Sequence, residues 1–152
     1  RMKVKIKVNG KLFDKHIPND MMLIDFLRKY GFYSVKRGCE SSNCGLCTVW
    51  VDQKPVLSCS YPAARADGHE VTTLEGVLPE AEVFGRVMAS MGAEQCGFCS
   101  PGFVMAVLAL KREIPNPTEE QAREYLAGNL CRCSGYASQM KAVMQYLKEG
   151  YQ

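Results

Sequence analysis

Eight cysteines are the side chains of this 152-residue chain that most clearly indicate chemistry. The first cysteine group is Cys39, Cys44, Cys47 and Cys59, and the second cysteine group is Cys96, Cys99, Cys131 and Cys133. A cysteine thiolate is a nucleophile and a strong ligand for soft metal ions. Because each group holds four sulfurs, the pattern predicts two metal sites with four thiolate ligands each.

The first cysteine group has the spacing C-x4-C-x2-C-x11-C. Its first three members match the ligand loop of plant-type [2Fe–2S] proteins, in which the fourth cysteine comes later. Such a loop must direct backbone N–H groups at sulfurs that carry excess negative charge, and Gly38 and Gly45 permit the backbone angles that this needs. Zinc and disulfide bonds are the alternatives, but structural zinc sites more often show paired C-x2-4-C knuckles. The spacing therefore favours an iron–sulfur cluster.

The second cysteine group has the less specific spacing C-x2-C-x31-C-x-C, which leaves a four-cysteine zinc site open. After Cys99 come Ser100, predicted to be a helix N-cap, and Pro101, predicted to be the first helical residue. The positive end of that helix dipole is expected to lower the pKa of both nearby thiols and so favour metal-binding thiolates. An iron–sulfur half beside this group favours iron here too, because a second redox centre extends an electron path.

The elements that must position the first group form a small α+β unit. Residues 4–8 alternate apolar and charged side chains and run into Asn9-Gly10, which predicts a strand and a two-residue hairpin turn. The other predicted elements are a helix over about residues 21–30 capped by Asp20, and strands at residues 48–51 and 71–74. Trp50 is expected in the core of this unit rather than in an electron relay.

The second group lies in a half whose pattern is helical throughout, from Pro79 onwards, and predicts a four-helix bundle. Residues 103–110 are apolar on all sides, so their helix should be central. Thr118 and Gln121 have the spacing of a capping box that starts a further helix. Both paired cysteine segments precede helices, which predicts two helix pairs with the metal between them.

Composition narrows the classes of partner. The net charge of +3 and the lack of a long Lys/Arg run argue against a nucleic-acid partner. The longest apolar run, at residues 103–110, is too short for a membrane span. The printed chain starts with a charged, alternating strand pattern and no visible signal peptide, so we expect a cytoplasmic protein, in which cysteines more often hold metal than form disulfides.

Two longer strings resemble a known family. Residues 95–102 (QCGFCSPG) and 128–136 (GNLCRCSGY) resemble the small iron–sulfur subunit of the molybdenum hydroxylases, the family of xanthine dehydrogenase, aldehyde oxidoreductase and carbon monoxide dehydrogenase. Residues 38–39 and 44–49 match the first cluster loop of that family. The resemblance implies an α+β protein, with a β-grasp ferredoxin-like domain at residues 1–75 and an all-α four-helix [2Fe–2S]-binding bundle at residues 76–152.

The same resemblance implies an electron-transfer role. Electrons would pass from a molybdopterin, expected as the cytosine dinucleotide, on a large subunit to the second cysteine group, then to the first, then to FAD on a medium subunit. Gln95 and Cys133 match positions that approach the pterin, so Cys133 would both ligate iron and contact the pterin. The chain itself shows no candidate general base and is expected to be inert alone. The alternatives are a zinc-stabilised interaction module and a free-standing two-cluster ferredoxin.

The sequence departs from the family pattern in two places. Residues 40–43 (ESSN) replace a loop that is usually glycine-rich and acidic, which puts the N–H pattern around that cluster, and its reduction potential, in question. Gln139 stands where the family usually has an aliphatic residue. We expect Gln139 to alter the packing of its helix without touching a metal ligand.

Overall fold

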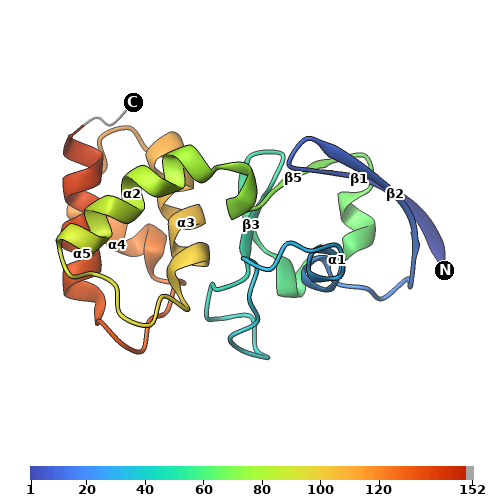
Figure 1. Cartoon of the computed structure of the whole chain (residues 1–152), viewed down its shortest axis with the longest axis horizontal. Helices are drawn as coiled ribbons and strands as arrows, with labels where there is room; N and C mark the ends of the chain where they lie inside the picture. The colour runs from blue at the N-terminus through green and yellow to red at the C-terminus, as the bar shows by residue number, and fades with distance from the viewer. Residues whose placement is uncertain (150–152) are drawn as a thin grey trace.

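The computed structural model describes residues 1–149 and shows a sheet half joined to a helical half (Figure 1). The sheet half contains β1 (Met2–Val8), β2 (Lys11–Ile17), α1 (Leu23–Lys29), β3 (Thr48–Val51), β4 (Lys54–Leu57) and β5 (Glu70–Thr72), with the short 3-10 helices η1 (Ser58–Ser60), η2 (Ala63–Ala66) and η3 (Leu74–Gly76). The helical half contains α2 (Leu78–Ser90), α3 (Ser100–Glu113), α4 (Glu119–Leu126) and α5 (Tyr136–Lys148). The predicted α+β class, a ferredoxin-like unit followed by a helical unit, is confirmed.

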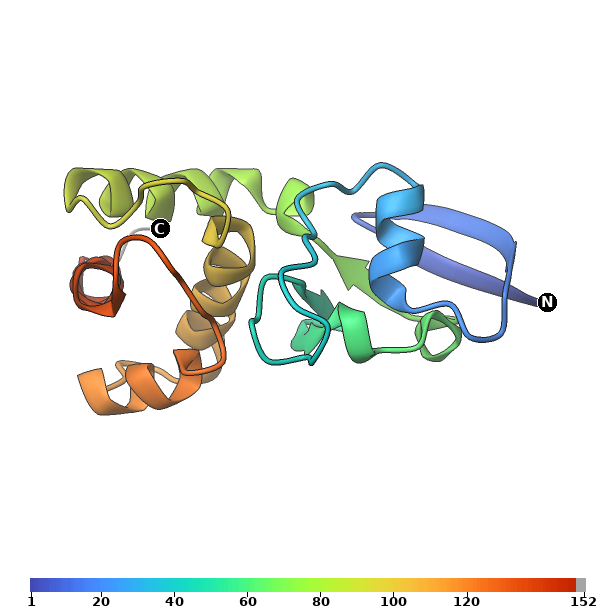
Figure 2. The same ribbon diagram turned by 90° about the horizontal axis from the view of Figure 1, so that it is seen from below.

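The sheet half is one mixed sheet with a helix across one face. Its strand order is β2-β1-β5-β3-β4, in which β1 and β5 run parallel and the other neighbours are antiparallel. Helix α1 lies against this sheet, and the views from two sides agree on its place (Figure 2). The buried side chains of β1 alternate along the strand and share one apolar core with α1. Burial of that alternating face is what fixes the register of the strand.

Local signals predicted two features of the chain correctly. Asn9 and Gly10 both have positive φ angles, 49° and 83°, as a two-residue hairpin turn between β1 and β2 requires. At the start of α4, Thr118 Oγ1 accepts from the backbone N–H of Gln121 at 3.2 Å, and Gln121 Oε1 accepts from the N–H of Thr118 at 2.9 Å. The capping box is therefore confirmed.

The predicted start of α1 was wrong. The helix begins at Leu23, and Met22 at its N-cap position provides no side-chain hydrogen bond. Main chain from a distant segment takes the place of Asp20: the N–H of Leu23 donates to the carbonyl of Tyr61 at 2.7 Å. A long-range backbone partner therefore satisfies a donor that we assigned to a local cap.

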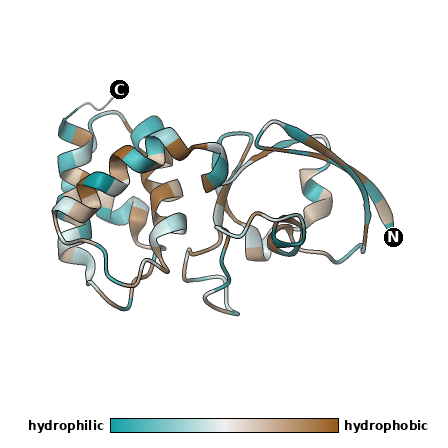
Figure 3. Cartoon of the chain, viewed as in Figure 1, coloured by the Kyte–Doolittle hydropathy of each residue, from teal (hydrophilic) through white to brown (hydrophobic). Residues whose placement is uncertain are grey.

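Helix α3 is the centre of the helical half, as predicted. Every residue from 102 to 110 is buried, and the hydropathy colouring shows an apolar α3 between the other helices and the sheet half (Figure 3). Helices α2 and α5 pack beside it through Phe84 and Tyr146, whose rings are 5.0 Å apart. Among the described residues, no helix combines the length and apolar character needed to cross a bilayer.

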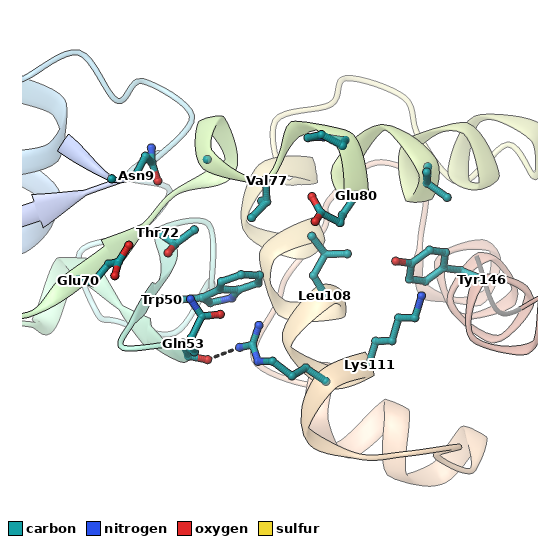
Figure 4. Close-up of a pocket in the computed structure, with 15 residues that line it drawn as sticks. Asn9, Trp50, Gln53, Glu70, Thr72, Val77, Glu80, Leu108, Lys111 and Tyr146 are labelled. Carbon is teal, nitrogen blue, oxygen red and sulfur yellow. Dashed lines mark hydrogen bonds between the residues drawn. The ribbon is translucent and has the colours of Figure 1, made fainter. Parts of the chain in front are cut away.

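The two halves meet where α3 packs against β3, and this corrects the expected place of Trp50. Its side chain belongs to the core of the helical half, where the indole N–H donates to the carbonyl of Met105 at 3.0 Å. The Arg112 guanidinium lies 4.2 Å from the Trp50 ring and also donates to the carbonyl of Gln53. Trp50, Gln53 and Arg112 all line a cleft of about 910 Å³ between the halves, and Figure 4 labels the first two. The halves therefore share a packed interface.

Candidate metal centres

The first cysteine group lies in the loop between α1 and β3, with its fourth member in η1. The structure places the four thiols in two interacting pairs, Cys39 with Cys44 and Cys47 with Cys59. The hydroxyl of Ser42 lies 3.5 Å from Cys59 Sγ, so the intervening loop also closes over this group. The assignment of all four cysteines to one cluster stays a prediction.

Backbone N–H groups point at the sulfur of Cys39. Donation from the N–H of Asn43, then from those of Ser41 and Cys44, lowers the Cys39 pKa to about 6. Ser42 takes a positive φ of 58°, the left-handed conformation that usually favours glycine. The loop of residues 40–43 therefore keeps donors aimed at this sulfur although its glycines are absent.

Two thiols of the first group are buried. Burial raises the pKa of Cys47 to about 11 and also raises the pKa of Cys44. Cys47 is only 2% exposed. A buried thiolate is unfavourable unless a positive centre compensates its charge, and a bound metal supplies that compensation. These two residues fit metal ligands better than free thiols.

The second cysteine group comes from two loops that precede α3 and α5. Cys96 Sγ and Cys133 Sγ lie 3.3 Å apart, and the thiols of Cys99 and Cys131 are hydrogen-bonded to each other. A disulfide bond would need about 2.05 Å. All eight cysteines are free thiols in this structure. The group again consists of two pairs.

The expected cap at the start of α3 was wrong. Cys99 occupies the N-cap position of α3, and its side chain makes no capping hydrogen bond. Ser100, which we expected to be the cap, instead donates from Oγ to Glu94 Oε1 at 2.7 Å. The expected lowering of both thiol pKa values holds for Cys96, where the N–H of Phe98 donates to the sulfur. It fails for Cys99, because burial and then the neighbouring Cys131 raise its pKa to about 11. Burial outweighs the helix dipole at this position.

Cys131 and Cys133 show opposite shifts. Burial opposes ionisation of Cys131, but hydrogen bonds from the Ser134 hydroxyl and from the N–H groups of Cys133 and Ser134 lower its pKa to about 7. The adjacent Cys96 raises the pKa of Cys133. Each pair of this group therefore joins one thiol with a lowered pKa to one with a raised pKa, so the sulfurs share a negative charge that a metal would hold.

A cavity of about 320 Å³ lies beside the second group and reaches the edge of the first. Its lining includes Cys44 of the first group and all four members of the second. Among residues 1–149, no group of three or more Cys, His, Asp or Glu side chains is arranged to hold a single metal ion; the sulfurs stand in pairs instead. Paired thiolates fit a diiron rhomb, in which four terminal cysteines ligate two irons.

The two ligand loops touch through main chain. The N–H of Leu130, directly before Cys131, donates to the carbonyl of Cys44 at 2.8 Å. The Asn129 side chain donates to the carbonyls of Gly45 at 3.2 Å and Gly102 at 3.4 Å. These bonds connect the first loop, the start of α3 and the segment before α5.

Glycine is required where these segments meet. A Cβ atom on Gly45 would lie 2.4 Å from the carbonyl oxygen of Gly128, and Gly45 has a φ of +75°. A Cβ atom on Gly102 would lie 2.4 Å from the carbonyl oxygen of Gly45. Any side chain at either place would push the loops apart. The sequence marked Gly45 as a loop residue, but it gave no signal for this contact.

Gln95 lies beside the exposed edge of the second group. Its side-chain Nε2 donates to the carbonyl of Cys133 at 3.5 Å, and both residues are exposed. The exposed apolar side chains of Phe98, Leu130 and Tyr136 belong to the same two loops and the start of α5. We call these three residues the apolar rim.

The expectation that Gln139 would not touch a metal ligand was wrong. Its side chain is 3% exposed, and its Nε2 lies 3.7 Å from Cys99 Sγ. It therefore does touch a candidate ligand. No local pattern could show this, because the two residues are 40 positions apart and meet only through the packing of α5 against the loop before α3.

Comparison with known proteins decides the family. Residues 6–75 match the family model of the 2Fe-2S iron-sulfur cluster binding domain, and residues 73–144 match that of the [2Fe-2S] binding domain. The chain is 42% identical, over 93% of its length and 91% of the relative, to the xanthine dehydrogenase iron-sulfur-binding subunit of Escherichia coli O157:H7. The chain belongs to the iron–sulfur subunits of the molybdenum hydroxylases.

Other members of the family agree. The small FeS subunit of nicotinate dehydrogenase from Eubacterium barkeri is 35% identical over 98% of this chain and 96% of that subunit. The fold matches a chain of quinoline 2-oxidoreductase from Pseudomonas putida 86, with a TM-score of 0.86, 33% identity and coverage of 98% and 97%. It also matches the aldehyde oxidoreductase of Desulfovibrio desulfuricans, with a TM-score of 0.89, 35% identity and 17% of that longer chain covered. As an iron–sulfur subunit of an oxidoreductase, this chain transfers electrons within a molybdenum hydroxylase.

Proposed function

We propose that this chain relays electrons from a molybdopterin on a large subunit, through two [2Fe–2S] clusters, to FAD on a medium subunit. The observation that carries the proposal is the hydrogen bond from the N–H of Leu130 to the carbonyl of Cys44. It links a residue adjacent to Cys131 with a member of the first cysteine group. A short bonded route therefore runs between the two candidate ligand sets.

The ligand assignment follows the observed pairs. Cys39 with Cys44, and Cys47 with Cys59, would hold the two irons of the cluster in the sheet half. The helical-half pairs are Cys96 with Cys133, and Cys99 with Cys131. When bound, each cluster accepts and releases one electron. The protein contributes position, hydrogen bonds to the sulfurs and partial burial, which set how readily each cluster is reduced.

The direction of electron flow rests on exposure. Cys96 and Cys133 are exposed and lie beside the apolar rim, whereas Cys44 and Cys47 are buried. An exposed edge with apolar neighbours is suited to docking on a second protein. We assign this edge to the large subunit, with Gln95 and Cys133 approaching the pterin, and we assign the cytosine dinucleotide to that pterin on family resemblance alone.

The flavin partner and the remaining assignments also rest on the family. The sheet-half cluster would pass electrons on to FAD in a medium subunit. We place the domain boundary between residues 75 and 76, and the complex in the cytoplasm, where reducing conditions keep unmetallated thiols from forming disulfides.

Metal and sulfide analysis tests the proposal. The chain co-expressed with its large and medium subunits is purified, and iron, zinc and acid-labile sulfide are measured together with the visible spectrum. We expect iron and sulfide in equal amounts and a brown protein. Zinc without sulfide in a colourless protein would instead establish the zinc-stabilised interaction module. Isolation of the loaded chain as a stable monomer that binds neither larger subunit would favour a free-standing ferredoxin.

A further inference from the structure

The amide of Gln139 occupies an unusual environment for a polar group. It lies in the first turns of α5 and is 3% exposed. Its Nε2 lies 3.7 Å from Cys99 Sγ, within the range of an N–H···S hydrogen bond, whereas no protein partner reaches its Oε1 among the described residues. An amide with only one end satisfied is less favourable in an apolar interior than a hydrocarbon side chain of the same size. Packing alone therefore does not account for a glutamine here.

The orientation of the amide matches the chemistry of its neighbour. A thiolate can only accept hydrogen bonds, and the side-chain NH₂ group of glutamine can only donate them. Cys99 is also partly buried, and burial is the largest cause of its raised pKa. A donor that is itself buried, as this amide is, interacts more strongly with a sulfur than an exposed donor does, because the local dielectric is lower.

We propose that Gln139 raises the reduction potential of the helical-half cluster by donating a hydrogen bond to Cys99 Sγ. This inference rests on the proposed function, in which Cys99 is an iron ligand. One-electron reduction adds negative charge that is partly carried by the ligand sulfurs, and no bond of the cluster breaks. An N–H dipole aimed at one sulfur stabilises the reduced form more than the oxidised form.

The consequence concerns how the two clusters share an electron. The electron comes from the molybdenum site of the large subunit and enters the helical-half cluster first. A higher reduction potential makes this cluster a better electron acceptor. The electron then stays on this cluster longer before it moves to the cluster of the sheet half. The side chain of Gln139 thus sets the partition of one electron between the two clusters, although it is not itself a ligand.

The test uses the purified complex and a redox titration followed by electron paramagnetic resonance. Gln139→Leu removes the donor at similar volume, and Gln139→Met repeats the change with a more flexible side chain. Gln145→Leu is the matched control, because it makes the same change on α5 about 9 Å further along the helix axis. We expect both Gln139 variants to shift the electron partition about tenfold away from the helical-half cluster. This corresponds to a fall of about 59 mV in the reduction potential of that cluster, a one-electron couple. The reduction potential of the sheet-half cluster should not change in these variants, and neither potential should change in Gln145→Leu.

The other outcomes separate this inference from the proposed function. Loaded clusters with unchanged potentials in both Gln139 variants would overturn the inference and leave the relay intact. A shift of similar size in Gln145→Leu, or in the sheet-half cluster, would also overturn it. So would failure of both variants to load the helical-half cluster, because the amide would then be needed for assembly rather than for potential. A wild-type complex without iron and sulfide would remove the proposed function and this inference together.

Discussion

Gly102 offers a sharp test of the contact between the two ligand loops. In Gly102→Ala, the new Cβ would lie 2.4 Å from the carbonyl oxygen of Gly45 and 2.9 Å from two backbone atoms of Leu46. The first approach is about 1 Å shorter than the 3.4 Å at which ordinary contact begins. All three neighbours are backbone, so no side chain can rotate away, and the loops must separate.

The expected loss of stability can be estimated. Overpacking a tight interior typically costs about 1–3 kcal/mol, and backbone neighbours place this case near the upper end. Alanine regains about 0.5–1 kcal/mol over glycine inside a helix, since Gly102 lies within α3 and needs no positive φ. The net loss in the free energy of unfolding is therefore about 2 kcal/mol. For a chain of this size, that corresponds to a fall in Tm of about 4–8 °C.

Gly85→Ala is the matched control. Gly85 also lies inside a helix, α2, but nothing lies within 4 Å of the Cβ that alanine would add. The same substitution should therefore raise the free energy of unfolding by about 0.5–1 kcal/mol. Thermal unfolding of both variants, followed by circular dichroism on the cluster-loaded chain, measures the two effects. Equal Tm values for Gly102→Ala and the wild type, or equal losses in both variants, would refute the reasoning.

Two further changes test the ligands and the junction between the halves. Cys133→Ser should alter the paramagnetic resonance of the helical-half cluster and leave that of the sheet-half cluster unchanged, and two unchanged signals would contradict the ligand assignment. Although burial opposes it, hydrogen bonds from Ser34 and Thr73 lower the pKa of Glu75 below its ordinary value of 4.5. A carboxyl pKa that is lowered in the folded state stabilises the fold above the ordinary pKa. Glu75→Gln should therefore lower the free energy of unfolding by less than about 1 kcal/mol at pH 7. This difference from the wild type should disappear in acid, as the pH falls below 4.5. A pH-independent difference in denaturant titrations would exclude this role for Glu75.

Features encoded by neighbouring residues could be predicted from the sequence. Asn9-Gly10 must form a tight turn because both residues tolerate positive φ, and Thr118 with Gln121 satisfies helix N–H groups within one turn. The spacing of the first cysteine group works in the same way, because one short loop carries three of its four members. In each case the interacting atoms lie within about a dozen residues of each other.

Features that depend on long-range packing could not be predicted. Ser100 had the right type and position for a cap, but Glu94 takes its hydroxyl. Trp50 alternates correctly for a strand, yet no alternation shows that α3 covers its face of β3. Gln139 reaches Cys99 only after α5 has packed against the loop before α3. Sequence pattern predicts the cysteines of both centres, whereas a neighbour such as Gln139, which we propose tunes one of them, is found only in the tertiary structure.

The magnetic interaction between the two clusters tests the relay most directly. The purified complex is reduced fully and partially, and its paramagnetic resonance is recorded at each stage. Because the loop of Cys44 and the segment before Cys131 are hydrogen-bonded, we expect two distinct [2Fe–2S] signals that split or broaden each other when both clusters are reduced. Two signals that simply add without interaction, or a single signal in a protein that also holds zinc, would contradict the relay.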